Sequence, residues 1–210
     1  MAKVRFITHK GVANYPWLNT PDFEYNSDGE YKVKMVFPNT DETQAMLAKL
    51  EEIRDSFYEE WKKNPKNKGK KANLADIGEW DEETDELKLN FKSKAQFTNK
   101  DTDEIIKIKI PLFDAKGTPV DVKIGGGSVL RIAYTPEGYY MASTKMIGVT
   151  CRIAAVKVIE LKEYAGAGAG AYGFDDDEEG YVAGDDNASG GDGDFDGQAN
   201  DNASGGDGDF

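Results

Sequence analysis

Lysine side chains alternate with apolar side chains along residues 31–37, 87–97 and 106–112. Such alternation is typical of a strand with one buried and one exposed face, so the lysines gather on the exposed faces. Positive groups arranged in rows can bind a phosphate backbone without reading its bases. Lys88 and Arg152 lie on such faces, and the residues that we predict as phosphate contacts are Lys32, Lys34, Lys92, Lys107, Lys109 and Arg131.

Four aromatic residues lie beside turns of the sequence, where their rings can remain exposed: Tyr15, Trp17, Tyr139 and Tyr140. An aromatic ring stacks on a nucleobase of any type, and rings combined with a basic groove hold single-stranded nucleic acid without sequence preference. The alternative is that the lysines keep the outer face of a sheet soluble while the tyrosines belong to its core.

The sequence offers few residues for catalysis. His9 is the sole histidine and Cys151 the sole cysteine, which excludes a metal cluster rich in these ligands. Glycines 125–127 are followed by Ser128 without the lysine of a phosphate-binding loop, and they precede a segment of strand character. The acidic residues 81–86 are typical of a solvated hairpin loop. We therefore predict that the protein is not an enzyme and uses no metal or cofactor.

The elements that must position these residues are mostly strands. Beyond the three alternating segments, residues 128–134 and 148–161 also have strand character. Residues 41–63 carry an apolar stripe at helical spacing, with Thr40 or Asp41 as the N-cap and Asn64-Pro65 as the stop. This order predicts a mainly β fold, a five-stranded oligonucleotide-binding barrel with one long helix plugging an end. A two-sheet sandwich remains the alternative.

The net charge of −13 is confined to one end of the chain. Residues 165–210 carry 13 acidic residues and no Lys or Arg, whereas residues 1–164 balance 26 acidic against 26 basic residues. This composition predicts a DNA-binding domain over 1–164 and a disordered acidic tail over 165–210. The decapeptide DNASGGDGDF occurs at 186–195 and again at 201–210. An aromatic ring in so polar a segment indicates a contact, so Asp207, Asp209 and Phe210 are the candidate partner-binding residues. The alternative is a recent duplication in drifting low-complexity sequence.

No apolar stretch approaches the ~20 residues that a membrane helix needs. Basic residues interrupt the first ten positions, unlike the apolar core of a signal peptide. With a single cysteine, Cys151, inside an apolar run, these features predict a soluble protein of a reducing cytoplasm with a buried thiol.

Taken in order, several short motifs resemble the single-stranded-DNA-binding proteins of short-tailed phages related to phage T7. The resemblance covers most of the chain. Its motifs are Met1-Ala2-Lys3, Tyr31-Lys32-Val33 with Pro38-Asn39, the helix stop Asn64-Pro65, Gly69-Lys70-Lys71, Gly125-Gly126-Gly127-Ser128, Val158-Ile159-Glu160-Leu161 and the terminal Gly208-Asp209-Phe210.

The resemblance implies an oligonucleotide-binding fold, a homodimer, strand annealing, and a tail that contacts the phage DNA polymerase and the primase-helicase. It also implies roles for single residues. Lys3, Lys68 and Lys92 match basic positions that the family uses for DNA, Tyr139 matches a stacking tyrosine, and Tyr15 and Trp17 match aromatic positions after a one-residue gap. Met141 stands where the family pattern has a second aromatic, and the loop 26–29 carries an acid, Asp28, where a basic residue is expected.

Two hypotheses follow. The first is a phage replication protein in the cytoplasm of an infected bacterial host, which coats and protects single-stranded DNA and recruits replisome proteins through its tail. The second is an acidic interaction protein or DNA mimic, in which the tail binds a basic host protein and the barrel is only a scaffold. A mimic would not need a body with lysine-bearing faces, aromatic residues and balanced charge, so these features favour the first.

Overall fold

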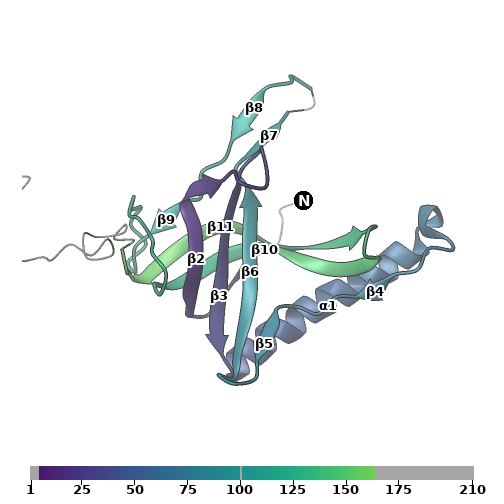
Figure 1. The fold of residues 1–210 in the computed structure, drawn as a ribbon, viewed down its shortest axis with the longest axis horizontal. Coiled ribbons are helices and arrows are strands. Elements are labelled where there is room, and N and C mark those ends of the chain that lie inside the picture. The colour runs from purple at the N-terminus through teal and green to yellow at the C-terminus, as the bar shows by residue number, and fades with distance from the viewer. Residues whose placement is uncertain (1–4, 100, 164–210) are drawn as a thin grey trace, which may run out of the picture. The chain divides into compact units, whose positions relative to one another are not determined.

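The structure, a computed structural model, describes residues 5–99 and 101–163; the predicted acidic tail lies outside these ranges. Within them the fold is mainly β, with one long helix (Figure 1). The elements are β1 (Phe6–Ile7), β2 (Gly11–Asp22), β3 (Glu30–Pro38), α1 (Asp41–Lys63), the short 3-10 helix η1 (Pro65–Asn67), β4 (Asn73–Leu74), β5 (Glu79–Asp81), β6 (Glu86–Lys94), β7 (Gln96–Thr98), β8 (Ile105–Lys107), β9 (Leu112–Phe113), β10 (Val129–Met141) and β11 (Met146–Glu160).

The five longest of these strands close into a ring. Their order is β10-β2-β3-β6-β11, and β11 pairs back with β10. Neighbours in the ring are antiparallel except for β6 and β11, which run parallel. This closed barrel with one long helix confirms the predicted oligonucleotide-binding fold class and excludes the two-sheet sandwich.

The period-two pattern predicts the buried face of the barrel correctly. Val33 and Met35 on β3, and Leu89 and Phe91 on β6, are buried in one core, while the lysines between them point outward. A single-residue slip of either strand would expose this entire apolar set.

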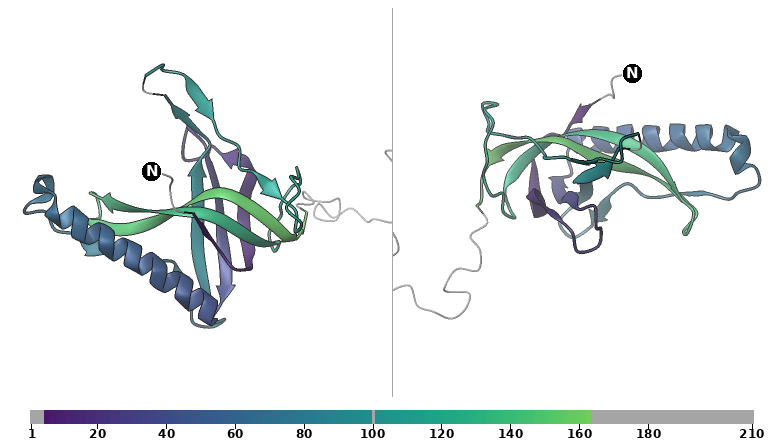
Figure 2. Two further views of the ribbon diagram at one scale, coloured as in Figure 1. Left: turned by 180° about the vertical axis from the view of Figure 1, so that it is seen from behind. Right: turned by 90° about the horizontal axis from the view of Figure 1, so that it is seen from above.

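Helix α1 has the predicted boundaries. The side chain of Thr40 caps it by accepting a hydrogen bond from the backbone N–H of Thr43, and Pro65 follows its C-cap. The first half of the helix contributes Leu50 to the barrel core, as a plug would. Its second half runs beyond the barrel alongside the β10–β11 hairpin, where the Trp61 ring packs on Tyr140 (Figures 1 and 2).

The prediction of one strand over residues 106–112 was wrong. Strand β8 ends at Lys107 and belongs to the β7–β8 hairpin, a separate small sheet outside the barrel. Ile105 in this hairpin is 62% exposed, whereas Ile110 and Leu112 enter the core after the chain has left the strand. Regular alternation therefore persisted across a change of element.

In the described part of the chain, α1 does not have the apolar character that crossing a membrane requires, nor does any other helix.

Cys151 lies buried on β11, as predicted, and burial raises the pKa of its thiol to about 12. Because only the thiolate is nucleophilic, a shift of this size lowers the reactive fraction at neutral pH roughly a thousandfold. We expect an aromatic disulfide reagent to leave the native thiol unmodified and to titrate it promptly in denaturant. Rapid modification of the native protein would show that β11 opens readily.

Candidate nucleic-acid interface

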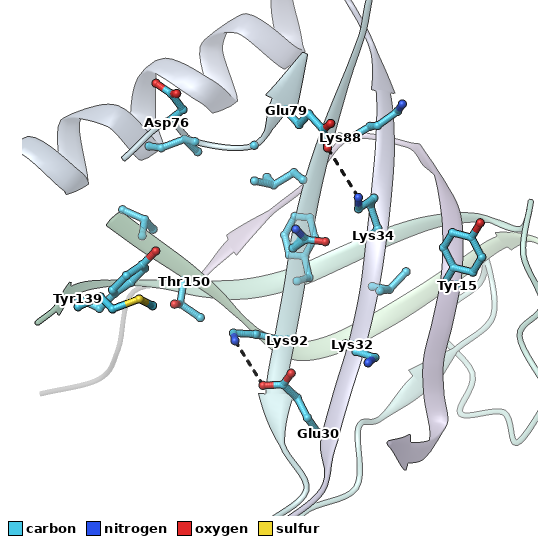
Figure 3. A pocket seen from close by; sticks show the side chains of 18 residues that line it. Tyr15, Glu30, Lys32, Lys34, Asp76, Glu79, Lys88, Lys92, Tyr139 and Thr150 are labelled. Atoms are coloured by element: carbon cyan, nitrogen blue, oxygen red, sulfur yellow. Dashed lines mark ion pairs between the residues drawn. The ribbon is translucent and has the colours of Figure 1, made fainter. Parts of the chain in front are cut away.

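A groove of about 670 Å³ lies on the outer face of β3 and β6 (Figure 3). Strand β2 borders it on one side, and the β10–β11 hairpin borders it on the other. The connection between α1 and β6 contributes Asp76, Ile77, Gly78 and Glu79 to its wall.

Four lysines line this groove: Lys32 and Lys34 from β3, and Lys88 and Lys92 from β6. Because the strands alternate, these lysines lie on the face opposite the core. Lys32 and Lys92 are direct cross-strand partners in the antiparallel register. Like charges placed opposite one another destabilise a sheet, so this arrangement favours a site where an anion is bound.

Each groove lysine has a carboxylate partner. Lys32 pairs with Asp22, Lys34 with Glu79 at 3.7 Å, Lys88 with Asp81 at 2.6 Å, and Lys92 with Glu30 at 3.5 Å. The hydrogen bond to Asp81 raises the pKa of Lys88 and lowers that of Asp81, so both remain charged at neutral pH.

Tyr139 borders the groove from β10, and Gly148 makes room for it. The two residues are cross-strand partners, and a Cβ added at Gly148 would lie 2.6 Å from the Tyr139 hydroxyl oxygen. The ring therefore lies over bare backbone of β11. Neighbouring positions of β10 face the other way: Gly138 approaches the Phe57 ring of α1 closely, and Tyr140 packs on Trp61.

Tyr15 borders the opposite side of the groove (Figure 3). It lies at an irregularity in the β2–β3 register, between Asn14 and Trp17, and its φ of 49° is in the left-handed region. A large side chain rarely adopts this backbone conformation, and such residues concentrate at functional sites. The Tyr15 side chain is 82% exposed, so a ring is held in solvent at some conformational cost.

Three further candidates lie in the barrel region but do not line the groove. The Tyr140 ring is engaged by α1, and the Arg131 Nε donates to the Thr8 carbonyl at 2.9 Å. Trp17 is half-exposed on β2, opposite Lys32 in the register. The DNA contacts of Arg131 and Trp17 stay predictions, whereas the packing of Tyr140 on Trp61 leads us to expect a structural role for its ring.

The remaining candidates lie elsewhere. Lys68 is exposed just after η1, and Lys107 is exposed on β8. Lys109 pairs with Asp121 at 3.5 Å. Lys3 and the tail residues Asp207, Asp209 and Phe210 lie outside the described residues.

Sequence reasoning missed three residues of this region. Lys88 was assigned to the same exposed face as Lys92 but was left out of the predicted phosphate contacts. Tyr25, in the loop between β2 and β3, is exposed, and the Lys32 Nζ lies 6.0 Å from its ring centroid. The role of Gly148 could not be seen from sequence, because it depends on which residue of β10 lies opposite.

His9 makes packing and hydrogen-bonding contacts within the fold. Its Nε2 lies 2.9 Å from the Thr43 Oγ1, its ring packs on Phe37, and burial lowers its pKa. Among residues 5–99 and 101–163, no three or more His, Cys, Asp or Glu side chains are grouped as metal ligands.

Comparison with known proteins adds to this geometry. The family described as single-stranded DNA-binding protein, bacteriophage T7, matches residues 10–161. The chain belongs to this family. Because the family consists of DNA-binding proteins, a non-enzymatic class, this membership confirms that the protein is not an enzyme.

Two relatives and one solved structure illustrate the family. The chain is 30% identical to the single-stranded DNA-binding protein of Escherichia phage T7, over 87% of each chain. It is 28% identical to that of Enterobacteria phage T3, over 83% of each. The crystal structure of gp2.5, a single-stranded DNA-binding protein encoded by bacteriophage T7, aligns with a TM-score of 0.65 at 30% identity, covering 79% of this chain and 97% of gp2.5. The predicted resemblance is therefore confirmed.

Proposed function

We propose that the protein binds single-stranded DNA in the β3–β6 groove without reading its sequence. The observation that carries this proposal is the pair of rings, Tyr15 and Tyr139, on either side of a surface bearing four lysines. The face of the second and third barrel strands is where this fold binds oligonucleotides. The family's name, that of single-stranded DNA-binding proteins, supports the same function.

Two kinds of side chain in the groove have different roles in binding. The lysines hold phosphates, which supplies affinity and strong salt dependence but no base recognition. The rings stack on bases, and every base presents a π-face. In a duplex the bases are already stacked on one another, so the rings gain nothing and binding favours single strands.

The finer function is phage replication in the cytoplasm of the infected bacterial host. The protein coats and protects single-stranded intermediates and promotes annealing of complementary strands, and it acts as a homodimer. The acidic segment 165–210 recruits the phage DNA polymerase and the primase-helicase, with Phe210 as the anchor and Asp207 and Asp209 as charges that steer the approach. Family membership and the composition of this segment support these assignments.

The test is a titration of the full chain with oligo-dT and with a duplex of equal length, followed by fluorescence anisotropy. We expect a strong preference for the single strand, with affinity falling as salt rises by about 0.7 logarithmic units per phosphate neutralised. Mixed-sequence single strands should bind about as well as oligo-dT. Equal affinity for duplex at low salt would rule out the stacking mechanism, and failure to bind DNA at all would favour the acidic interaction protein or DNA mimic.

A further inference from the structure

The groove is much less basic than its lysines suggest. Its lining includes four lysines and three carboxylates, Glu30, Asp76 and Glu79, a net of only one positive charge. Two of these carboxylates pair with groove lysines: Glu30 with Lys92 at one end of the groove and Glu79 with Lys34 at the other (Figure 3). A DNA phosphate must therefore approach lysines that already have an anion.

We propose that Glu30 and Glu79 are affinity-setting residues, which occupy Lys92 and Lys34 in the free protein and yield them to DNA phosphates. This inference rests on the proposed function and identifies which residues limit its strength. Each carboxylate holds the place of a phosphate, so binding exchanges one ion pair for another.

The geometry of the two pairs suits such an exchange. Their N···O distances of 3.5 and 3.7 Å are longer than the 2.6 Å between Lys88 and Asp81. Glu79 is 70% exposed, and water screens its attraction to Lys34. Pairs of this kind contribute little to folding, yet in a groove they subtract from the attraction offered to a phosphate. The exchange also releases fewer counterions than binding to free lysines would, which flattens the salt dependence.

The experiment compares the full-length wild type with Glu30→Gln, Glu79→Gln and the double variant, using oligo-dT at low salt. Each substitution preserves size and one acceptor oxygen while removing one charge. We expect each single variant to bind roughly two- to fivefold more tightly, in line with the strength of exposed ion pairs, and the double variant to have a steeper salt slope. Thermal melting monitors the fold.

The matched control is Glu52→Gln on α1. It removes the same charge and breaks the exposed Lys49–Glu52 pair, in which the Glu52 side chain is 66% exposed, but it does not line the groove. If Glu30→Gln and Glu79→Gln bind oligo-dT no more tightly than Glu52→Gln does, the proposal is overturned, even where the wild type binds DNA well. Failure of the wild type to bind single strands overturns the proposed function itself.

A double-mutant cycle tests whether Glu30 limits DNA affinity through Lys92. In a Lys92→Gln background, Glu30→Gln has no lysine to release. The gain in oligo-dT affinity that Glu30→Gln causes should therefore largely disappear. A gain that persists undiminished shows general repulsion of DNA and overturns the claim that Glu30 acts by occupying Lys92.

Discussion

Removing both rings that flank the groove, as Tyr15→Ala with Tyr139→Ala, is expected to weaken oligo-dT binding about thirtyfold or more. A lost base stack costs ~1–3 kcal/mol, and the two rings lie on different strands, β2 and β10, so their losses should nearly add. The lysines remain, so residual binding should keep the salt slope of the wild type. Anisotropy titrations across salt concentrations measure both quantities.

Tyr140→Ala is the matched control for this result. It removes the same ring one residue away, but from the face of β10 that packs on Trp61 of α1. We expect a lower melting temperature and nearly unchanged DNA affinity. If Tyr140→Ala weakens binding as much as Tyr139→Ala does, at temperatures where both are folded, the stacking platform includes the α1 side of the hairpin.

Removal of residues 165–210 is expected to tighten DNA binding at low salt by tenfold or more. This segment carries 13 acidic residues without a Lys or Arg, so we expect it to compete with phosphates for the groove lysines. Its composition predicts a coil with a reach of roughly 35 Å, and tethering holds such a coil at about millimolar effective concentration. Comparison of the full chain with a chain ending at Tyr164 measures the effect.

The gain in DNA affinity on removal of residues 165–210 should shrink as salt rises, because screening weakens the attraction of the groove for the tail and for DNA alike. Unchanged affinity at low salt would limit the tail to recruiting partners. Deleting Phe195 and Phe210 together separates the two roles, since the charges remain while both copies of the aromatic anchor are lost. Binding to the polymerase should then fail while DNA affinity stays close to that of the full chain.

The strands of the barrel could be predicted because one face of each is buried. Leu87, Leu89 and Phe91 alternate with polar residues on β6, and the core enforces that period. The same rule failed at 106–112, where Ile105 and Ile106 lie in a hairpin outside the barrel and no buried face corrects the register. The boundaries of α1 were predictable because Thr40 and Pro65 act locally.

The site was less predictable than the fold. Period two separates Tyr139 from Tyr140, but only the position of α1 decides which of them lines the groove and which packs on the helix. Lysines on β3 and β6 could be assigned to one face, whereas their partners Glu30 and Glu79 lie 62 and 45 residues away from Lys92 and Lys34. Such pairings depend on strand order, which local patterns do not contain.

Closure of the barrel has a consequence for synthesis of the protein. One contact of the ring pairs Val12 on β2 with Val129 on β10, so it joins segments that are made far apart in time. At ~5–20 residues per second, β2 waits roughly 6–23 seconds for β10. Tyr15 and Tyr139 come to line one groove only after β10 has been made. A ribosome-bound chain that lacks β10 therefore offers the groove lysines to single-stranded DNA but not the second ring. Full affinity for DNA should therefore appear in one late step of translation rather than growing with chain length.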